Sequence, residues 1–254
     1  MRLQMETDFR LALERSEFLL HYQPIVALAG SRPVGAEALV RWKHPIRGLL
    51  PPSQFLPLAE ETGLIVELDR WVLREACRQL AHWRMLRPEW GTLVMNVNVD
   101  ERQMGSVEIT GDVERLLSSH RLPSSCLRLE VTENVFRSGS SHAREQLEAL
   151  KALGVGLAVD DFGTGYSSLE AFAASSFDAL KIDQSFVRDL TINPRHRAIV
   201  RTIIGFARDL GLLLTAEGIE TEEQRQLLLE LGCEFGQGNL FAPALGPDEF
   251  ERRL

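Results

Sequence analysis

The chain has 254 residues, 44% of them hydrophobic, and a formal charge of −8. This length can bury a large core, either as one α/β barrel or as two smaller domains. The acidic balance excludes a broad basic field of the kind that holds a DNA or RNA polymer or an anionic membrane. Attraction of an anionic substrate would therefore have to be local.

The three cysteines lie far apart in the sequence, and none belongs to a C-x-x-C pair. This spacing argues against a disulfide framework and a zinc ribbon, and it indicates a reducing, cytoplasmic compartment. No apolar run approaches the roughly 18 residues that a membrane span requires. The N-terminus also lacks the basic segment followed by an apolar segment that is typical of a signal peptide. We therefore expect no membrane contact by this segment.

The chain begins with an amphipathic segment, METDFRLALERSEF, which is followed by two strand-like runs, LLHYQPIVAL and VGAEALVRW. The connection between these runs, around AGSRP, is well below the dozen or more residues that a parallel crossover needs. The first two strands are therefore predicted to be antiparallel.

Strand-like and helix-like runs alternate in the rest of the chain. Strands are expected near 93–99, 126–132, 155–160, 178–182, 212–216 and 234–237, with helices at 66–86, 141–154, 196–211 and 221–232 between them. The last helix has a start signature, Thr221 with Gln224, and a stop at Gly232. About eight strands in such an alternation favour a TIM-type (β/α)8 barrel over an open sheet. No linker divides the chain, so we predict a single domain over residues 1–254.

Polar groups stand where these strands end, and the carboxyl ends of barrel strands meet on one face. The groups are Glu37, Asn98, Glu130, Asp160 with Asp161, Lys181, Glu217 and Gln237. Each alone could be a helix N-cap or a solvated loop residue. Together, however, the carboxylates would repel one another strongly unless divalent cations were present. The lack of nearby His and Cys favours Mg²⁺ or Mn²⁺ over zinc.

Two cationic residues each leave two interpretations open. Lys181 either serves this face or forms a structural salt bridge to one of the carboxylates. Arg41 alternates to the same side as Glu37 and either meets an anion there or is solvated. The sequence contains neither G-x-x-x-x-G-K-[ST] nor H-E-x-x-H. The residues alone thus predict a metal-dependent enzyme that acts on a phosphate ester.

The segment GAEALVRW carries the Glu-Ala-Leu signature of EAL domains, which are cyclic di-GMP-specific phosphodiesterases. The chain is similar to this family over nearly its whole length. Eight motifs occur in family order: LLHYQPIV, EALVRWKHP, NVNVDERQM, LEVTEN, VDDFGTGYSSL, ALKIDQSFV, TAEGIE and GCEFGQGNLF. The resemblance implies a TIM-type barrel modified with one antiparallel strand near the N-terminus.

The resemblance also implies two divalent cations, Mg²⁺ or Mn²⁺, in each active site, with Ca²⁺ as an inhibitor. One cation would be held by Glu37, Asn98, Glu130 and Asp160, and the other by Asp160, Asp161 and Glu217. The two adjacent aspartates would then end a strand because they share both cations.

The implied reaction is hydrolysis of cyclic di-GMP to linear pGpG, with Glu217, Lys181 and Glu37 as catalytic residues. Lys181 would position or activate the attacking water, and Glu217 would be either a metal ligand or the general base. The residues that would contact substrate or support the site are Gln23, Leu39, Arg41, Asp183, Glu220 and Gln237. A loop containing Gly163, Thr164 and Gly165 would support the second cation, braced by Glu133.

Two residues depart from the family pattern: Asp100 replaces a usual serine, and Asn239 replaces a common aromatic residue. Neither is a ligand position, so the departures concern substrate affinity more than chemistry. The alternative function is a catalytically silent EAL module that acts as a cyclic di-GMP receptor or an interaction scaffold. Intact ligand positions favour the enzyme. An unrelated metal-dependent barrel lyase is a third, weaker interpretation.

We expect two kinds of protein partner. The resemblance, with apolar faces near 166–174 and 196–210, predicts a homodimer, although such faces can also pack on the barrel. The opening MRLQMETDFR resembles the join that follows a sensor or diguanylate cyclase domain. Residues 1–6 are accordingly interpreted as the remnant of an upstream linker.

Overall fold

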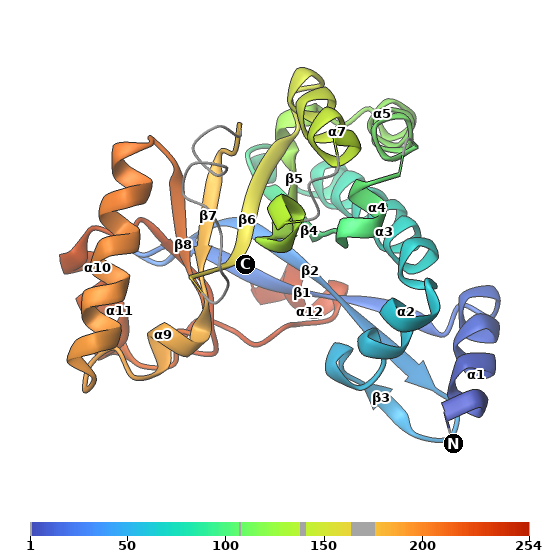
Figure 1. Cartoon of the computed structure of the whole chain (residues 1–254), viewed down its shortest axis with the longest axis horizontal. Coiled ribbons are helices and arrows are strands. Elements are labelled where there is room, and N and C mark those ends of the chain that lie inside the picture. Colours follow the sequence, from blue (N-terminus) through green and yellow to red (C-terminus); the bar gives the residue numbers. More distant parts are fainter. Residues whose placement is uncertain (1, 107, 138–140, 164–175, 254) are drawn as a thin grey trace.

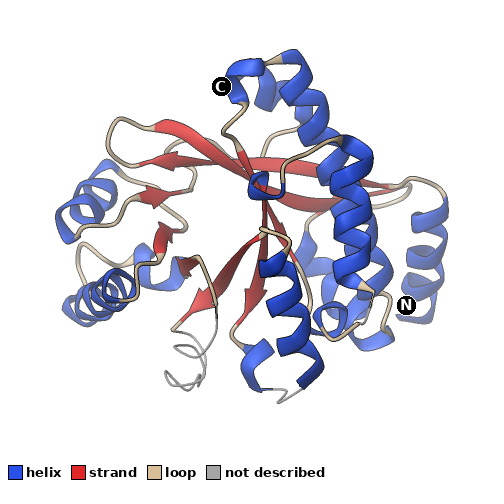
Figure 2. Ribbon diagram, turned by 90° about the horizontal axis from the view of Figure 1, so that it is seen from above, coloured by secondary structure: helices blue, strands red, loops and turns tan. Residues whose placement is uncertain are grey.

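The computed structural model describes residues 2–106, 108–137, 141–163 and 176–253. The strands in these residues form one sheet in which β1 pairs with both β9 and β2, so the sheet closes into a barrel. Figure 1 shows the strands at the centre of the molecule, and Figure 2 shows helices arranged around them. The strands are β1 Phe18–Ala27, β2 Arg32–His44, β3 Gly48–Leu50, β4 Val94–Asn98, β5 Leu127–Thr132, β6 Gly156–Phe162, β7 Ala179–Ile182, β8 Leu213–Ala216 and β9 Phe235–Gly236.

Strand β1 runs antiparallel to both of its barrel neighbours, and the other neighbouring strands of the barrel are parallel. This confirms the predicted TIM-type barrel with one antiparallel strand near the N-terminus. Strand β3 was not predicted. It pairs antiparallel with the end of β2, and its three residues are too few to show a periodicity.

Helices follow most of the parallel strands and cover the outside of the barrel (Figure 2). They are α1 Arg2–Glu14, α2 Leu56–Thr62, α3 Ile65–Leu86, α4 Glu101–Met104, α5 Ile109–His120, α6 Asn134–Arg137, α7 Ser141–Ala152, α9 Gln184–Arg188, α10 Pro194–Asp209, α11 Glu222–Leu231 and α12 Pro247–Arg253, with short 3-10 turns at Pro52–Gln54, Pro88–Trp90 and Ser124–Cys126. The predicted capping box of α11, Thr221 with Gln224, is present, and Gly232 ends that helix in the left-handed conformation.

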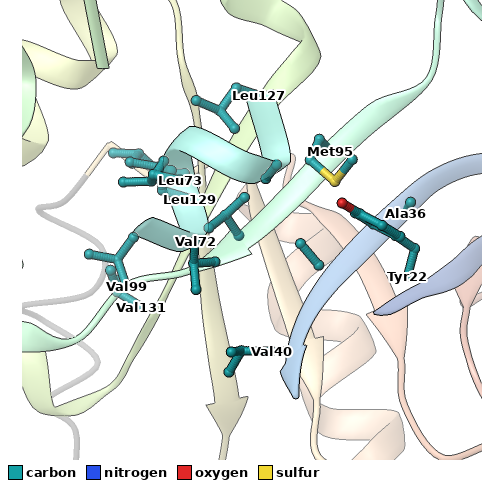
Figure 3. Close-up of a cluster of buried hydrophobic side chains, with 14 of the residues drawn as sticks. Tyr22, Ala36, Val40, Val72, Leu73, Met95, Val99, Leu127, Leu129 and Val131 are labelled. Atoms are coloured by element: carbon teal, nitrogen blue, oxygen red, sulfur yellow. The ribbon is translucent and has the colours of Figure 1, made fainter. Parts of the chain in front are cut away.

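Side-chain alternation along the strands separates an apolar outside from a polar inside. Val72 and Leu73 of α3 lie beside Leu129 of β5 in the buried cluster of Figure 3, which also contains Met95 of β4. Because successive residues of a strand point to opposite faces, the residues between these apolar ones point into the barrel. Those inward positions carry Asn96 and Asn98 on β4, Arg128 and Glu130 on β5, and Lys181 on β7.

Strands β1 and β2 extend beyond the barrel towards α1 and α2 (Figure 1). An aromatic cluster packs these helices against the strands. Phe9 of α1 packs on Phe18 and Trp42 with ring centroids 5.1 and 5.5 Å apart, and Phe55 joins the same cluster. The predicted amphipathic segment at the N-terminus is thus a helix fixed by aromatic packing.

Two further expectations concern surfaces. Among the described helices, none has the length and apolar character needed to cross a bilayer. The helix face predicted to support a homodimer lies on α10, and much of it is used inside the domain: Val200, Ile203, Ile204 and Ala207 are buried. Ile199 is 37% exposed. The other predicted face, 166–174, lies outside the described residues, so the homodimer stays a prediction.

Gly238 lies very close to the backbone of Ile219, in the loop that follows β8. It follows β9 with φ +155°, and a Cβ at this position would lie 2.2 Å from the Ile219 carbonyl oxygen. Gly238→Ala would push the loop after β8 away, so we expect a loss of unfolding free energy of at least about 2 kcal/mol in urea denaturation.

Gly205→Ala is the matched control. This glycine sits inside α10, and among the described residues a Cβ added there would meet no atom of a neighbouring element within 4 Å. Alanine at this position should stabilise the protein by up to about 1 kcal/mol. A Gly238→Ala protein as stable as the wild type would contradict the close backbone approach at Ile219.

Candidate active site

Lys181 lies at the centre of the predicted site, and its ammonium group contacts four carboxylates. Its Nζ is 2.6 Å from Glu217, 2.7 Å from Glu130, 3.1 Å from Glu37 and 3.3 Å from Asp160. The lysine is only 1% exposed. The structure thus brings together carboxylates from β2, β5 and β6 and from the residue after β8, as the convergence of strand ends predicted.

Amide side chains orient two of these carboxylates. Asn98 donates through Nδ2 to Glu37 Oε1 at 2.7 Å. Gln237 donates through Nε2 to Glu37 Oε2 at 2.5 Å and to Glu217 Oε1 at 3.0 Å. Asn98 and Gln237 therefore lie within the site, in direct contact with predicted metal ligands.

A local irregularity in β6 explains how two adjacent aspartates serve one site. In a regular strand, neighbouring side chains would point to opposite faces. Here the pairing with β7 shifts between Val159 and Phe162, and Asp161 adopts the left-handed conformation with φ +54°. The Asp161 amide also donates to Asp160 Oδ1 at 3.0 Å. The bulge lets both carboxylates lie at the mouth of the barrel.

Three carboxylates form a group that fits a divalent cation. Oxygens of Asp160, Asp161 and Glu217 all lie within 4.8 Å of one another, and such hard oxygen ligands suit Mg²⁺ or Mn²⁺. With Glu37 and Glu130, the site contains five carboxylates and one lysine ammonium, which leaves a formal charge of −4. Two divalent cations would cancel that charge, so the residues present fit the expected pair of ions.

Burial and neighbouring charges shift the pKa values of these groups. Burial raises the pKa of Glu130 to about 8, and the charges of Glu37 and Asp160 add to the rise despite the opposing effect of Lys181. Burial and neighbouring carboxylates also raise the pKa of Glu217 above its ordinary value. Burial would raise the pKa of Glu37 too, but Lys181 and two amide donors lower it overall. Burial alone would lower the pKa of Lys181, which the surrounding carboxylates hold well above its usual value.

A cavity of about 250 Å³ opens beside the carboxylates. Four predicted substrate-binding residues line it together with Glu37, Asp160 and Glu217: Gln23, Leu39, Glu220 and Gln237. Asn239, one of the two departures from the family pattern, also lines this cavity. Asn239 therefore lies where it could contact a molecule bound in the cavity.

Arg41 and Asp183 are placed differently from the cavity-lining residues. Arg41 is half-buried on β2 and donates to the Val40 carbonyl oxygen at 2.9 Å. Asp183 caps α9 by accepting a hydrogen bond from the Ser185 amide at 3.0 Å. Burial and the charges of Asp160 and Asp183 raise the pKa of Asp161 to about 6. Asp183 therefore combines a capping role with a place beside the second predicted metal group.

Glu133 contacts Gly163 of the loop that it is predicted to brace. Glu133 Oε1 accepts a hydrogen bond from the Gly163 amide at 2.5 Å. Gly163 has φ +96°, and a Cβ there would lie 3.1 Å from the Phe186 ring. Thr164 and Gly165 lie outside the described residues, so their roles stay predictions.

Sequence reasoning missed two buried polar residues near the site. Asn96 is 2% exposed and donates through Nδ2 to Glu130 Oε1 at 2.7 Å. Its spacing of two residues from Asn98 on a strand was the available signal. Asp69 of α3 is 7% exposed and accepts a hydrogen bond from the Asp100 amide at 2.8 Å. It lies within a helix whose pattern gave no such signal.

Comparison with known protein families gives one match across most of the chain. The family model described as the EAL domain matches residues 6–244. The chain is an EAL domain. It therefore belongs to the family of cyclic di-GMP phosphodiesterases that its motifs resemble.

Two curated relatives of this EAL domain come from Pseudomonas aeruginosa. MucR, a bifunctional diguanylate cyclase/cyclic di-GMP phosphodiesterase, is 44% identical over 240 residues, which cover 94% of this chain and 35% of MucR. NbdA, a cyclic di-GMP phosphodiesterase, is 43% identical over 253 residues, which cover 98% of this chain and 32% of NbdA. The chain thus spans about a third of the length of these multidomain relatives.

Solved structures agree with the fold of this EAL domain. The PaMucR phosphodiesterase in complex with c-di-GMP has a TM-score of 0.92 at 42% identity, covering 97% of this chain and 99% of that chain. The EAL enzyme Bd1971, with cAMP and cyclic di-GMP bound, has a TM-score of 0.94 at 32% identity, covering 99% of this chain and 68% of that chain.

Asp69 generates a pH-dependent prediction for this EAL domain. Burial, followed by the charges of Asp100 and Glu60, raises the pKa of Asp69 to about 8, although the hydrogen bond from the Asp100 amide opposes the rise. Between about pH 4 and pH 8 the folded state keeps this proton and the unfolded state loses it. The contribution of the Asp69 carboxyl to the unfolding free energy is therefore fully present below about pH 4. It falls by about 1.4 kcal/mol per pH unit as the pH rises from about 4 to about 8.

Asp69→Asn removes this titration and keeps the size of the side chain. We expect the variant to gain stability relative to the wild type as the pH rises from 5 to 7, measured by urea denaturation at each pH. A stability difference that is the same at pH 5 and pH 7 would show that Asp69 does not retain its proton in the fold.

Proposed function

We propose that this EAL domain hydrolyses cyclic di-GMP to linear pGpG with the help of two divalent cations, Mg²⁺ or Mn²⁺. The observation that carries the proposal is the group formed by Asp160, Asp161 and Glu217, with oxygens within 4.8 Å of one another at the mouth of the barrel. The bound ligand of the PaMucR phosphodiesterase, 42% identical over nearly the same length, supports cyclic di-GMP as the substrate.

The arrangement around Lys181 is compatible with the two ligand sets that the family resemblance implies. Asp160, Asp161 and Glu217 would hold one cation, and Asp160 would share the other with Glu37, Asn98 and Glu130. Divalent cations at such a site lower the pKa of a bound water and neutralise negative charge on phosphate oxygens. The net negative charge of the carboxylates is what would attract these cations to the site.

In the proposed reaction a water oxygen forms a bond to phosphorus and the bond from phosphorus to the ribose 3′ oxygen breaks. The water gives up one proton, the 3′ oxygen gains one, and the product carries a 5′ phosphate. Lys181 Nζ, which lies 2.6 Å from Glu217 and 3.3 Å from Asp160, would orient groups around that water. Glu217 would act either as a ligand or as the acceptor of the water proton.

The cavity residues would hold the substrate beside these groups. Gln23, Leu39, Glu220 and Gln237 line the cavity, and Arg41 is the cation nearest to it along β2, two residues beyond Leu39. A local cation suits a small anionic dinucleotide, whereas the formal charge of −8 disfavours a DNA or RNA polymer. Asp183 would support the site through Asp161.

The intact carboxylate cluster favours an enzyme over a silent receptor or scaffold. A receptor can bind a nucleotide without five crowded carboxylates. Their mutual repulsion lowers the stability of the fold unless bound cations offset it. Within a longer protein, we propose that an upstream sensor or cyclase-like domain and a second copy of this domain are partners of the phosphodiesterase.

Metal dependence follows directly from the cluster. The purified domain should convert cyclic di-GMP to pGpG in Mg²⁺ or Mn²⁺, show no turnover in EDTA, and be inhibited by Ca²⁺. Calcium accepts looser and more variable coordination, which disturbs the positioning of an attacking water. Product identification by liquid chromatography checks the prediction. Undiminished hydrolysis in EDTA would rule out the two-cation proposal, and tight binding without turnover would favour the receptor.

Glu217→Gln should separate binding from chemistry. The variant keeps the side-chain volume and loses one negative charge, so turnover should fall on the order of a hundredfold or more, because that charge is felt chiefly in the transition state. Affinity for cyclic di-GMP, measured by calorimetry in Ca²⁺, should change little.

Glu223→Gln, an exposed change on the neighbouring helix α11, is the matched control and should retain wild-type turnover. If Glu217→Gln turns over like the wild type, Glu217 has no role in the reaction. Equal losses of binding and turnover would show that Glu217 holds the substrate in its ground state.

A further inference from the structure

Asn96 and Asn98 occupy consecutive inward positions of β4 and make matching contacts. Asn98 Nδ2 donates to Glu37 Oε1, and Asn96 Nδ2 donates to Glu130 Oε1, each at 2.7 Å. Lys181 donates to the second oxygen of each carboxylate, at 3.1 Å for Glu37 and 2.7 Å for Glu130. Glu130 is therefore held between one amide and the ammonium group, and Glu37 is held in the same way with Gln237 as a second amide donor.

The depth of the two asparagines differs. Asn98 is partly exposed at the end of β4, where it can reach a cation directly, whereas Asn96 lies one step further into the barrel and is 2% exposed. Glu130 is 1% exposed. Asn96 can thus act on a bound cation only through Glu130, whose orientation its hydrogen bond fixes.

Fold stability alone does not account for an amide at this place. Asn96 Oδ1 has no hydrogen-bond partner within the part of the chain that the structure describes. A buried polar atom without a partner costs free energy, and a purely structural position inside the barrel would be served better by an apolar side chain. Among the described residues, the Asn96 side chain makes one hydrogen bond, to the predicted metal ligand Glu130, and this bond explains the amide.

We propose that Asn96 is a positioning residue that holds the Glu130 carboxylate in the orientation required to bind a divalent cation. The inference rests on the proposed metal-dependent phosphodiesterase function. Groups that hydrogen-bond to metal ligands fix ligand geometry, and their loss weakens metal binding by about 10- to 100-fold. Without Asn96, Glu130 would keep its contact to Lys181 but could turn about that contact.

The test uses Asn96→Leu, which is similar in size and has no donor, and Asn96→Ala as a second variant. Mn²⁺ binding is measured by calorimetry without substrate, and hydrolysis of cyclic di-GMP is measured over a range of Mn²⁺ concentrations. Gln79→Leu is the matched control, because Gln79 is a buried amide on α3 outside the barrel interior. Thermal unfolding in EDTA monitors the fold of each variant.

We expect Mn²⁺ affinity to fall about 10- to 100-fold in both Asn96 variants and to stay within about twofold in Gln79→Leu. We also expect excess Mn²⁺ to restore most of kcat, which a general folding defect would not allow. Unchanged Mn²⁺ affinity in the Asn96 variants would overturn the inference, as would a loss that excess Mn²⁺ cannot rescue. If the wild type itself neither binds Mn²⁺ nor hydrolyses cyclic di-GMP, the proposed function fails and this inference fails with it.

Discussion

The mutual repulsion of carboxylates at one end of the barrel is the constraint on which the site depends. Lys181, at 1% exposure, contacts four of them and offsets part of their charge. Removing one partner from such a buried ionic group costs about 3–5 kcal/mol, because the remaining charges lose their compensation. Burial, together with the neighbouring carboxylates, raises the pKa values of Glu130 and Glu217 although Lys181 opposes the rise. Cations bound at the proposed site would therefore stabilise the domain.

The barrel makes this concentration of charge tolerable by dividing its residues between two faces. Outward positions of β4, β5 and β7 carry apolar side chains that pack on the surrounding helices, and inward positions carry the polar set. Because the outward side chains supply the apolar packing, the inward positions can carry polar groups that do not contribute to a hydrophobic core. The bulge and left-handed backbone at Asp161 are a local departure of the same kind, since strained backbone persists where the surrounding structure holds it.

Sequence reasoning predicted most of the barrel and the convergence of its polar ends. Alternating strand and helix patterns located the strands from β4 to β9, and the short AGSRP connection predicted the antiparallel start. It missed β3, which has three residues, and Asn96, whose importance depends on a cross-strand contact that no local pattern contains. For Lys181 it left a single salt bridge as one interpretation, and the structure shows contacts with four carboxylates. The shortness of β3 accounts for the first miss, whereas the contacts of Asn96 and Lys181 involve residues from distant strands.

Anomalous diffraction from crystals grown with Mn²⁺ and without substrate tests the central claim most directly, because it locates the cations independently of any reaction. The account predicts two anomalous peaks at the mouth of the barrel. One should lie among Asp160, Asp161 and Glu217, and the other among Glu37, Asn98, Glu130 and Asp160. Crystals that diffract well but show no Mn²⁺ within this carboxylate cluster would contradict the account.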